Sequence, residues 1–223
     1  AIIDYFGNGS RFGVRLQYVK AEADYGTAGG VRNAAGLIGE RFLIISGDVL
    51  TDFNLTKAIA FHEQRQAMVT IVLYHSQNPL QYGVVITRDD GKIIRFVEKP
   101  TWGEVFSDTI NTGIYIIEPE ILDLVPRETE FDFSKDLFPL LLEKDDALFG
   151  YPSDGYWRDI GDLTEYQEAH RDSLAGRVKI DFPGDKDGKI YRGKGTRLQA
   201  EVNNLTGTVI IGENCTIGEN IRL

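Results

Sequence analysis

The alternation of short apolar runs with helical stretches over the first two thirds of the chain most constrains its fold. Residues 41–46 (RFLIIS) and 69–74 (VTIVLY) are largely apolar, which is typical of strands buried on both faces. Such strands, alternating with helices, predict an α/β sheet covered by helices on both faces. The predicted strands are 14–19, 41–46, 69–74, 83–88, 92–97 and 112–117, and the predicted helices are 28–37, 55–66, 134–143 and 163–174.

Local signals mark several ends of these elements. The run Asp89-Asp90-Gly91 between two predicted strands indicates a β-hairpin. Ser134 and Asp162 are predicted N-caps of the last two helices, because their side-chain oxygens can accept hydrogen bonds from free backbone N–H groups.

The C-terminal part has a different pattern. After a polar stretch at 183–189, interpreted as a linker, aliphatic or small apolar residues recur with a spacing of six: Leu205, Ile211 and Ile217, and Val209, Cys215 and Ile221. This spacing is typical of a parallel β-helix. Two ordinary strands joined by Gly-Glu-Asn turns are the alternative. The predicted domains are therefore 1–176 and 177–223, and we expect the chain to start inside the first and stop inside the second.

Charge and hydropathy exclude several classes of protein. The chain has 24 Lys and Arg against 34 Asp and Glu, a net charge of −10, which argues against a nucleic-acid-binding protein. No apolar run is long enough for a membrane helix, and no leader is recognisable. With a single Cys215, which can form no internal disulfide, these features predict a cytoplasmic protein. An anionic substrate would need a metal ion or a local group of Lys and Arg.

Two aspartates are candidates for a metal site. Asp48 follows the predicted strand 41–46, where ligands bind in open α/β sheets, and Asp159 lies far along the chain in the run 155–162 (GYWRDIGD). Two carboxylates with water and phosphate oxygens form a typical Mg²⁺ site. The alternative is that Asp48 stabilises a turn or caps a helix and that Asp159 is a helix cap, although Asp162 competes with Asp159 for the last helix.

Three further segments are candidates for substrate contacts. Glu98-Lys99-Pro100 ends the hairpin and offers a fixed cation beside a carboxylate, although a solvated ion pair is the commoner fate of such a pair. Tyr82-Gly83 and Asn111-Thr112-Gly113 combine a glycine with hydrogen-bonding groups. The segment 25–30 (YGTAGG) precedes a helix and could face an anion or a nucleobase, but it matches neither a P-loop nor a dinucleotide-binding motif.

Six short motifs follow one another along the chain: Gly26-Thr27-Ala28-Gly29, Gly47-Asp48, Tyr82-Gly83-Val84-Val85, Glu98-Lys99-Pro100, Asn111-Thr112-Gly113-Ile114-Tyr115 and Trp157-Arg158-Asp159-Ile160-Gly161. In this order the chain resembles the sugar-1-phosphate nucleotidyltransferases, and most of all the mannose-1-phosphate guanylyltransferases, including long bacterial forms with a phosphomannomutase-like domain. The resemblance implies a Rossmann-like mixed sheet, incomplete at its N-terminus, followed by the start of a left-handed parallel β-helix. It also implies a homo-oligomer.

The resemblance assigns a reaction and a role to each motif. A sugar 1-phosphate, expected to be mannose 1-phosphate, would attack the α-phosphorus of a nucleoside triphosphate, expected to be GTP, and release pyrophosphate. The implied catalytic residues are Asp48, Lys99 and Asp159, with Mg²⁺ held by Asp48 and Asp159 and the sugar phosphate neutralised by Lys99. The implied substrate-binding residues are Tyr82, Gly83, Glu98, Asn111 and Thr112, and the implied nucleotide-binding residues are Gly26, Thr27, Ala28 and Asp48.

Two features depart from the family pattern. Arg158 stands where many relatives have an apolar residue, and nothing in residues 1–20 matches the family's glycine-rich phosphate loop. We therefore expect these 223 residues alone to be inactive. The alternatives are a non-catalytic nucleotide-sugar-binding or regulatory subunit, or an enzyme for glucose 1-phosphate with UTP, dTTP or ATP. A hexapeptide acyltransferase is disfavoured because none of His62, His75 and His170 lies in the repeat.

Overall fold

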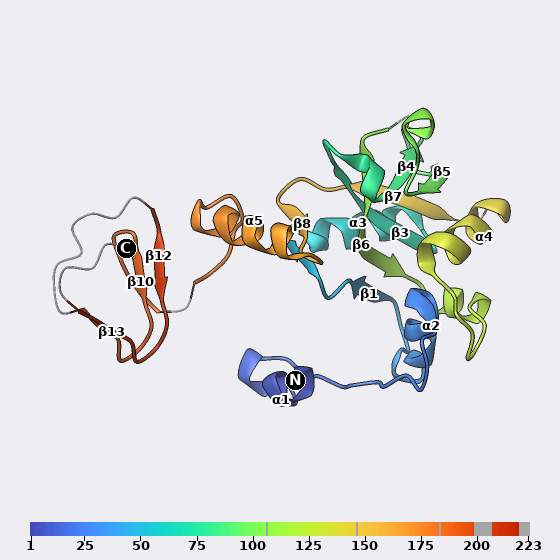
Figure 1. Cartoon of the computed structure of the whole chain (residues 1–223). Helices are drawn as coiled ribbons and strands as arrows, with labels where there is room; N and C mark the ends of the chain where they lie inside the picture. Colours follow the sequence, from blue (N-terminus) through green and yellow to red (C-terminus); the bar gives the residue numbers. More distant parts are fainter. Residues whose placement is uncertain (106, 146, 183, 199–206, 219–223) are drawn as a thin grey trace. The chain divides into compact units, whose positions relative to one another are not determined.

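The computed structural model describes residues 1–105, 107–145, 147–182, 184–198 and 207–218. The chain forms two compact units (Figure 1). Unit 1 contains Ala1–Ile45 and Leu55–Pro152, and unit 2 contains Ser46–Asn54 and Ser153–Leu223.

Unit 1 is built on one mixed sheet. Its strand order is β5-β4-β6-β3-β7, with β1 paired to β6 (Figure 1). Strands β3 and β7 are parallel and the other pairs are antiparallel. The strands are β1 (Phe42–Ile45), β3 (Val69–His75), β4 (Gly83–Thr87), β5 (Ile93–Glu98), β6 (Thr109–Ile117) and β7 (Leu148–Pro152). The predicted α/β class with a mixed sheet is confirmed.

Helices pack on both faces of this sheet. Along β3, Ile71 belongs to the apolar core with Phe138 and Leu141 of α4, whereas the neighbouring Thr70 contacts His62 of α3. Because successive side chains of a strand point to opposite faces, α3 and α4 cover opposite sides. The α-helices of unit 1 are α1 (Ile2–Phe6), α2 (Gly26–Asn33), α3 (Leu55–Arg65) and α4 (Phe138–Glu143). A π-turn, η6 (Phe133–Leu137), leads directly into α4. Short 3₁₀ turns are η1 (Ser10–Phe12), η2 (Ala35–Leu37), η3 (Pro79–Gln81), η4 (Trp102–Glu104) and η5 (Pro119–Leu124).

Unit 2 combines a short strand pair, one helix and several small strands. Strand β2 (Val49–Thr51) pairs antiparallel with β8 (Trp157–Asp159), and α5 (Leu163–Leu174) follows. The Asp162 side chain accepts hydrogen bonds from the backbone N–H groups of Thr164 (2.7 Å) and Glu165 (2.8 Å), so the predicted cap is confirmed. The remaining strands are β9 (Asp185–Asp187), β10 (Ile190–Arg192), β11 (Arg197–Leu198), β12 (Val209–Ile211) and β13 (Thr216–Ile217).

The small C-terminal strands form two parallel pairs. Ile190 of β10 is in register with Val209 of β12, and Arg197 of β11 with Thr216 of β13, so each partner lies 19 residues further along the chain. Of the six-residue repeat, Ile211 is buried and Val209, Cys215 and Ile217 are half-buried, whereas Leu205 and Ile221 lie outside the described residues. These pairs do not confirm a β-helix. They do show that β12 and β13, which carry residues of the repeat, run parallel to β10 and β11.

Four sequence predictions are wrong in detail. Residues 14–19 form no strand, and their apolar side chains Val14 and Val19 are exposed. Strand β1 is not fully buried, because it presents Leu43 and Ile45 on an uncovered face, with 37% and 46% exposure. An apolar run shows that a strand is favourable but not which of its faces is covered.

The other two errors concern polar segments. Ser134 caps no helix: it lies inside the π-turn, and its hydroxyl contacts β6 instead. The predicted linker at 183–189 contains β9, which forms a hairpin with β10, with Asp187 opposite Ile190. Pro183 lies outside the described residues. Within the part of the chain that the structure describes, no helix is both long and apolar enough to cross a membrane.

Candidate active site

The two predicted metal-binding aspartates lie close together in unit 2. Strands β2 and β8 place Val49 opposite Asp159, and the Ile160 N–H donates to the Asp48 carbonyl oxygen at 2.8 Å. The strand pair therefore fixes the backbone of both residues. A Cβ atom added to Gly161 would lie 3.0 Å from Asp159 Oδ1 and 3.6 Å from Asp48 Oδ2, so both carboxylates point to the same small volume.

This carboxylate pair is free of the helix-capping role that was the alternative for Asp159. Asp162 caps α5, and Asp159 Oδ1 accepts a hydrogen bond from the Gly161 N–H at 2.9 Å, which orients the carboxylate. Among the described residues, no group of three or more His, Cys, Asp or Glu side chains is arranged to hold a metal ion. Two carboxylates suit Mg²⁺, because this ion usually keeps several waters and takes further oxygens from substrate phosphates.

Arg158 is held by a network of hydrogen bonds and ion pairs with Tyr156 and with two acids of α5. Its Nε donates to the Tyr156 hydroxyl at 2.9 Å, and its guanidinium forms ion pairs with Glu165 and, at 3.1 Å, with Asp172. The buried Asp172 also accepts from the Tyr156 hydroxyl (2.6 Å) and Arg177 Nε (2.7 Å). The unexplained charge in the Trp-Arg-Asp-Ile-Gly motif thus pairs with acids and anchors β8 to α5.

The electrostatics of this network follow from burial and hydrogen bonding. Burial alone would raise the pKa of Asp172, but hydrogen bonds from Tyr156 and Arg177 and the nearby Arg158 charge hold it below the usual value. Burial, with the hydrogen bond to Asp172, raises the pKa of Tyr156 to about 12. Asp172 is therefore ionised and Tyr156 neutral near pH 7.

A second polar cluster lies in unit 1, on β5, β6 and the π-turn. Asn111 Nδ2 donates to the Tyr115 hydroxyl at 3.0 Å and to Ser134 Oγ at 3.3 Å, and Asn111 Oδ1 accepts from the Gly113 N–H at 3.0 Å. The Ser134 hydroxyl is also hydrogen-bonded to the Glu98 carboxylate. We call Glu98, Asn111, Tyr115 and Ser134 the polar cluster.

The pKa values in the polar cluster reflect its partial burial. Burial raises the pKa of Glu98, although the Lys99 charge and the Ser134 hydrogen bond act in the opposite direction. Burial also raises the pKa of Tyr115 to about 12, so that its phenol is neutral. Asn111 donates both amide hydrogens, one to Tyr115 and one to Ser134. It can therefore bind a ligand only by accepting a hydrogen bond at Oδ1.

Because Gly83 has no side chain, the Glu98 carboxylate and the Phe96 ring can approach the β4 backbone closely. Gly83 and Glu98 are opposite each other in the β4–β5 pair, and a Cβ on Gly83 would lie 2.8 Å from Glu98 Oε2 and 2.6 Å from Phe96 Cζ. Tyr82 contributes its carbonyl oxygen, which accepts from the Lys99 N–H at 3.2 Å. Lys99 has a φ of 45°, an unfavourable conformation for a residue with a side chain, and is exposed.

Thr112 differs from the other predicted substrate residues. Along β6 buried and half-buried residues alternate, so Asn111 and Thr112 point to opposite faces. The Thr112 side chain is buried, and its hydroxyl donates to the Val72 carbonyl oxygen at 2.7 Å. This hydroxyl stabilises the pairing of β6 with β3, and Thr112 is no part of the proposed site.

The predicted nucleotide segment packs against the chain that leads into the π-turn. Gly26 has a φ of 66°, and a Cβ there would lie 2.6 Å from Asp132 Oδ2. The Ala28 N–H donates to the Phe131 carbonyl at 2.9 Å, and Thr27 Oγ1 accepts from the Phe133 N–H at 3.0 Å. Residues 131–134 therefore connect the nucleotide segment with the polar cluster.

Sequence reasoning missed the contribution of this connecting segment. Asp132 beside Gly26 and Ser134 beside Asn111 belong to the candidate site, as does Tyr115 on β6. The only local signal is that polar residues stand between the phenylalanines of the run 131–136 (FDFSKD), whose rings pack into the core.

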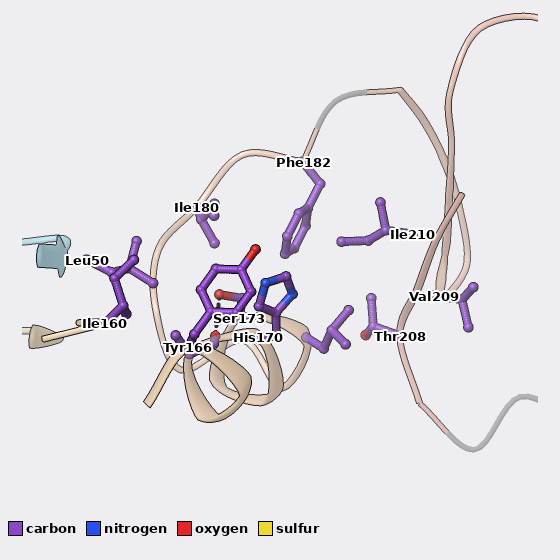
Figure 2. A pocket seen from close by; sticks show the side chains of 12 residues that line it. Leu50, Ile160, Tyr166, His170, Ser173, Ile180, Phe182, Thr208, Val209 and Ile210 are labelled. Carbon is purple, nitrogen blue, oxygen red and sulfur yellow. Dashed lines mark hydrogen bonds between the residues drawn. The ribbon is translucent and has the colours of Figure 1, made fainter. Parts of the chain in front are cut away.

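Unit 2 also contains an apolar cavity of about 520 Å³ (Figure 2). One face of α5 lines it, with the Tyr166 and His170 rings in contact at 4.5 Å between centroids, and Leu50, Ile160 and Phe182 are among its other lining residues. None of the predicted site residues lines it. Its apolar lining is unsuited to phosphate groups.

Comparison with known proteins identifies the family. A model of the family described as nucleotidyl transferase matches residues 1–176. The chain belongs to this family. The resemblance that the six motifs indicated is thereby confirmed at the level of the sugar-1-phosphate nucleotidyltransferases.

Relatives of this nucleotidyltransferase differ in their substrates. The chain is 34% identical to a UTP–glucose-1-phosphate uridylyltransferase of Synechocystis over 97% of its own length and 64% of the relative. It is 30% identical to a mannose-1-phosphate guanylyltransferase of Mycobacterium tuberculosis over 98% of its length and 60% of the relative. The chain thus spans less than two thirds of these curated relatives.

A solved structure shares the fold. A Bacillus anthracis protein crystallised with sucrose superposes with a TM-score of 0.69 at 22% identity, over 82% of this chain and 73% of that one.

Proposed function

We propose that the protein is a sugar-1-phosphate nucleotidyltransferase. An oxygen of the sugar phosphate forms a bond to the α-phosphorus of a nucleoside triphosphate, and the bond from that phosphorus to pyrophosphate breaks. The observation that carries the proposal is the convergence of Asp48 and Asp159 around Gly161, within a chain of the nucleotidyl transferase family. Phosphoryl transfer needs positioning and charge neutralisation rather than a covalent protein intermediate.

Asp48 and Asp159 are the proposed ligands of Mg²⁺. When bound, this ion neutralises negative charge on the phosphates of the nucleotide. The Gly161 N–H keeps the Asp159 carboxylate oriented, and the β2–β8 pair keeps Asp48 beside it. The fit rests on the shared direction of two carboxylates, that of Asp48 in the turn before β2 and that of Asp159 at the end of β8, the strand paired with β2.

The polar cluster is the proposed site for the sugar. Glu98 and Asn111 Oδ1 accept hydrogen bonds from sugar hydroxyls, while Gly83 leaves room for the Phe96 ring and the Glu98 carboxylate to pack against the β4 backbone. Tyr82 helps to fix the turn that exposes Lys99, whose ammonium neutralises the sugar phosphate.

The segment with Gly26, Thr27 and Ala28 is the proposed contact for the nucleoside. Its support is the close packing on residues 131–133, which holds the start of α2 rigid. For the substrate pair we propose mannose 1-phosphate and GTP. Glucose 1-phosphate with UTP, dTTP or ATP is the alternative, because relatives at similar identity act on different pairs.

We further propose that residues 1–176 form the catalytic domain and that 177–223 begin a left-handed parallel β-helix. Two parallel strand pairs with the same 19-residue offset support the solenoid. The homo-oligomer and the cytoplasmic location stay predictions.

A pyrophosphate-release assay on the protein made from its complete gene tests the proposal. Each of GTP, UTP, dTTP and ATP is supplied with mannose 1-phosphate and with glucose 1-phosphate, in the presence of Mg²⁺. We expect turnover, fastest with GTP and mannose 1-phosphate. Binding of a nucleotide sugar without pyrophosphate release from any pair would instead indicate a regulatory subunit.

A further inference from the structure

A polar cavity of about 310 Å³ lies in unit 1, between α2 and the loop that contains residues 127 and 128. Tyr25, Arg32 and Asn33 line it from the α2 side, and Arg127 and Glu128 line it from the loop. Gly29 also lines this cavity, whereas Thr27, two residues earlier, lies about 200° around the helix. The cavity is therefore distinct from the proposed nucleoside contact.

Arg32 carries the strongest indication of a ligand. Its side chain is only 16% exposed, and its Nη1 lies 3.2 Å from a carboxylate oxygen of Asp123, a side chain that is 79% exposed. The Arg32 Nε atom is buried and has no hydrogen-bond partner among the described residues. Buried N–H groups of a guanidinium are normally satisfied, so Arg32, which lines the cavity, has hydrogen-bonding capacity that its protein partners leave unused.

The cavity is rich in donors although the whole chain carries a net charge of −10. Four of its lining residues carry donor groups, namely Tyr25, Arg32, Asn33 and Arg127, against the single acid Glu128, which is exposed and has a φ of 54°. Guanidinium groups bind phosphate with paired hydrogen bonds, and they remain charged at any physiological pH.

We propose that this cavity binds the phosphate group of a small phosphorylated metabolite. The volume exceeds what a phosphate group fills, so the remainder of the molecule fits beside Tyr25 and Asn33. The Phe131 N–H donates to the Tyr25 carbonyl at 2.9 Å, so the loop and the start of α2 are already joined at one side of the cavity. A phosphate bridging Arg32 and Arg127 would join them more firmly and so stabilise the segment that includes Thr27.

Titration calorimetry with inorganic phosphate, at constant ionic strength, tests the site without using the enzymatic activity. We expect saturable binding that Arg127→Gln weakens about tenfold or more, because a charge-assisted hydrogen-bond pair is lost. Arg32→Gln should have a similar effect, and Arg32→Lys should restore only part of the affinity. Arg15→Gln is the matched control, because Arg15 is an exposed arginine outside the cavity. This variant should bind inorganic phosphate with unchanged affinity.

Three results would overturn the proposal: no saturable binding, equal competition by acetate, or binding that Lys99→Ala abolishes and Arg127→Gln leaves intact. The last result would assign the phosphate to the proposed sugar site, so the two proposals can fail separately. Arg127→Gln decides the matter if Arg32→Gln does not fold, because Arg127 is exposed and its removal leaves the core intact.

Discussion

Replacing Ser134 by alanine tests whether the polar cluster is a binding site or only a packing feature. The Ser134 hydroxyl contacts both the Glu98 carboxylate and the Asn111 amide, so the substitution removes one hydrogen bond to a charged group and one between neutral groups. The bond to the half-buried carboxylate contributes about 1.5 kcal/mol. We therefore expect kcat/KM for the sugar 1-phosphate to fall about tenfold, mainly through KM, with little change in KM for the nucleotide.

The pH profile gives a second, independent readout of the same variant. Burial raises the pKa of Glu98, and the Ser134 hydrogen bond opposes this by favouring the ionised form. Without Ser134 the pKa of Glu98 rises further, so the acid limb of kcat/KM should move to higher pH. A loss of stability alone would not move this limb.

Ser173→Ala is the matched control for this experiment. Its hydroxyl donates to the Ala169 carbonyl oxygen at 2.7 Å within α5, and it lies in the other unit. Steady-state kinetics across pH 5 to 8, roughly the range in which a carboxyl group with a raised pKa titrates, is the assay. Unchanged KM and an unchanged acid limb in Ser134→Ala would refute the role of the polar cluster.

Three further predictions concern close packing, capping and acid stability. Gly83→Ala should lower activity and the melting temperature, because the new Cβ would meet Phe96 at 2.6 Å, whereas Gly47→Ala, with nothing within 4 Å, should leave the melting temperature unchanged. Asp162→Ala should cost about 1 kcal/mol in urea unfolding, since two N–H groups of α5 lose their acceptor; no change would show that another group caps the helix. Burial lowers the pKa of His62 below 6.5, so the unfolded chain binds a proton more readily and stability should fall as pH drops below about 6.5. His62→Gln should flatten this dependence between pH 7.5 and 5.5, roughly one unit either side of the histidine's ordinary pKa, and an equally steep dependence in the variant would assign it to other groups.

The sequence is informative where function depends on the order of motifs. The spacing of Asp48 and Asp159 does not show that they meet, but the family resemblance carried by the ordered motifs pairs them, and the β2–β8 pair does bring them together. The strand pattern is equally reliable for 69–74 and for the hairpin, because apolar β-branched runs and an Asp-Asp-Gly turn are local signals.

The sequence is uninformative where a role depends on a partner from elsewhere in the fold. A serine ahead of an apolar helical stretch is a common N-cap, yet the Ser134 hydroxyl contacts Asn111 of β6. The charge of Arg158 has no explanation within its own motif because its partners Glu165 and Asp172 lie on α5, and a salt bridge of this kind has no spacing rule. The face of β1 that is exposed also depends on tertiary packing, not on its composition.

The most direct test of the account is pyrophosphate release by Asp48→Asn and Asp159→Asn in the protein made from its complete gene. Each substitution keeps the shape of the side chain and removes one of the two charges that converge on Gly161. We expect each to lower kcat by about 100-fold or more, while Asp154→Asn, an exposed aspartate of the same unit, should retain wild-type turnover. Wild-type turnover in either Asp48→Asn or Asp159→Asn would contradict the central claim that this carboxylate pair is the catalytic metal site.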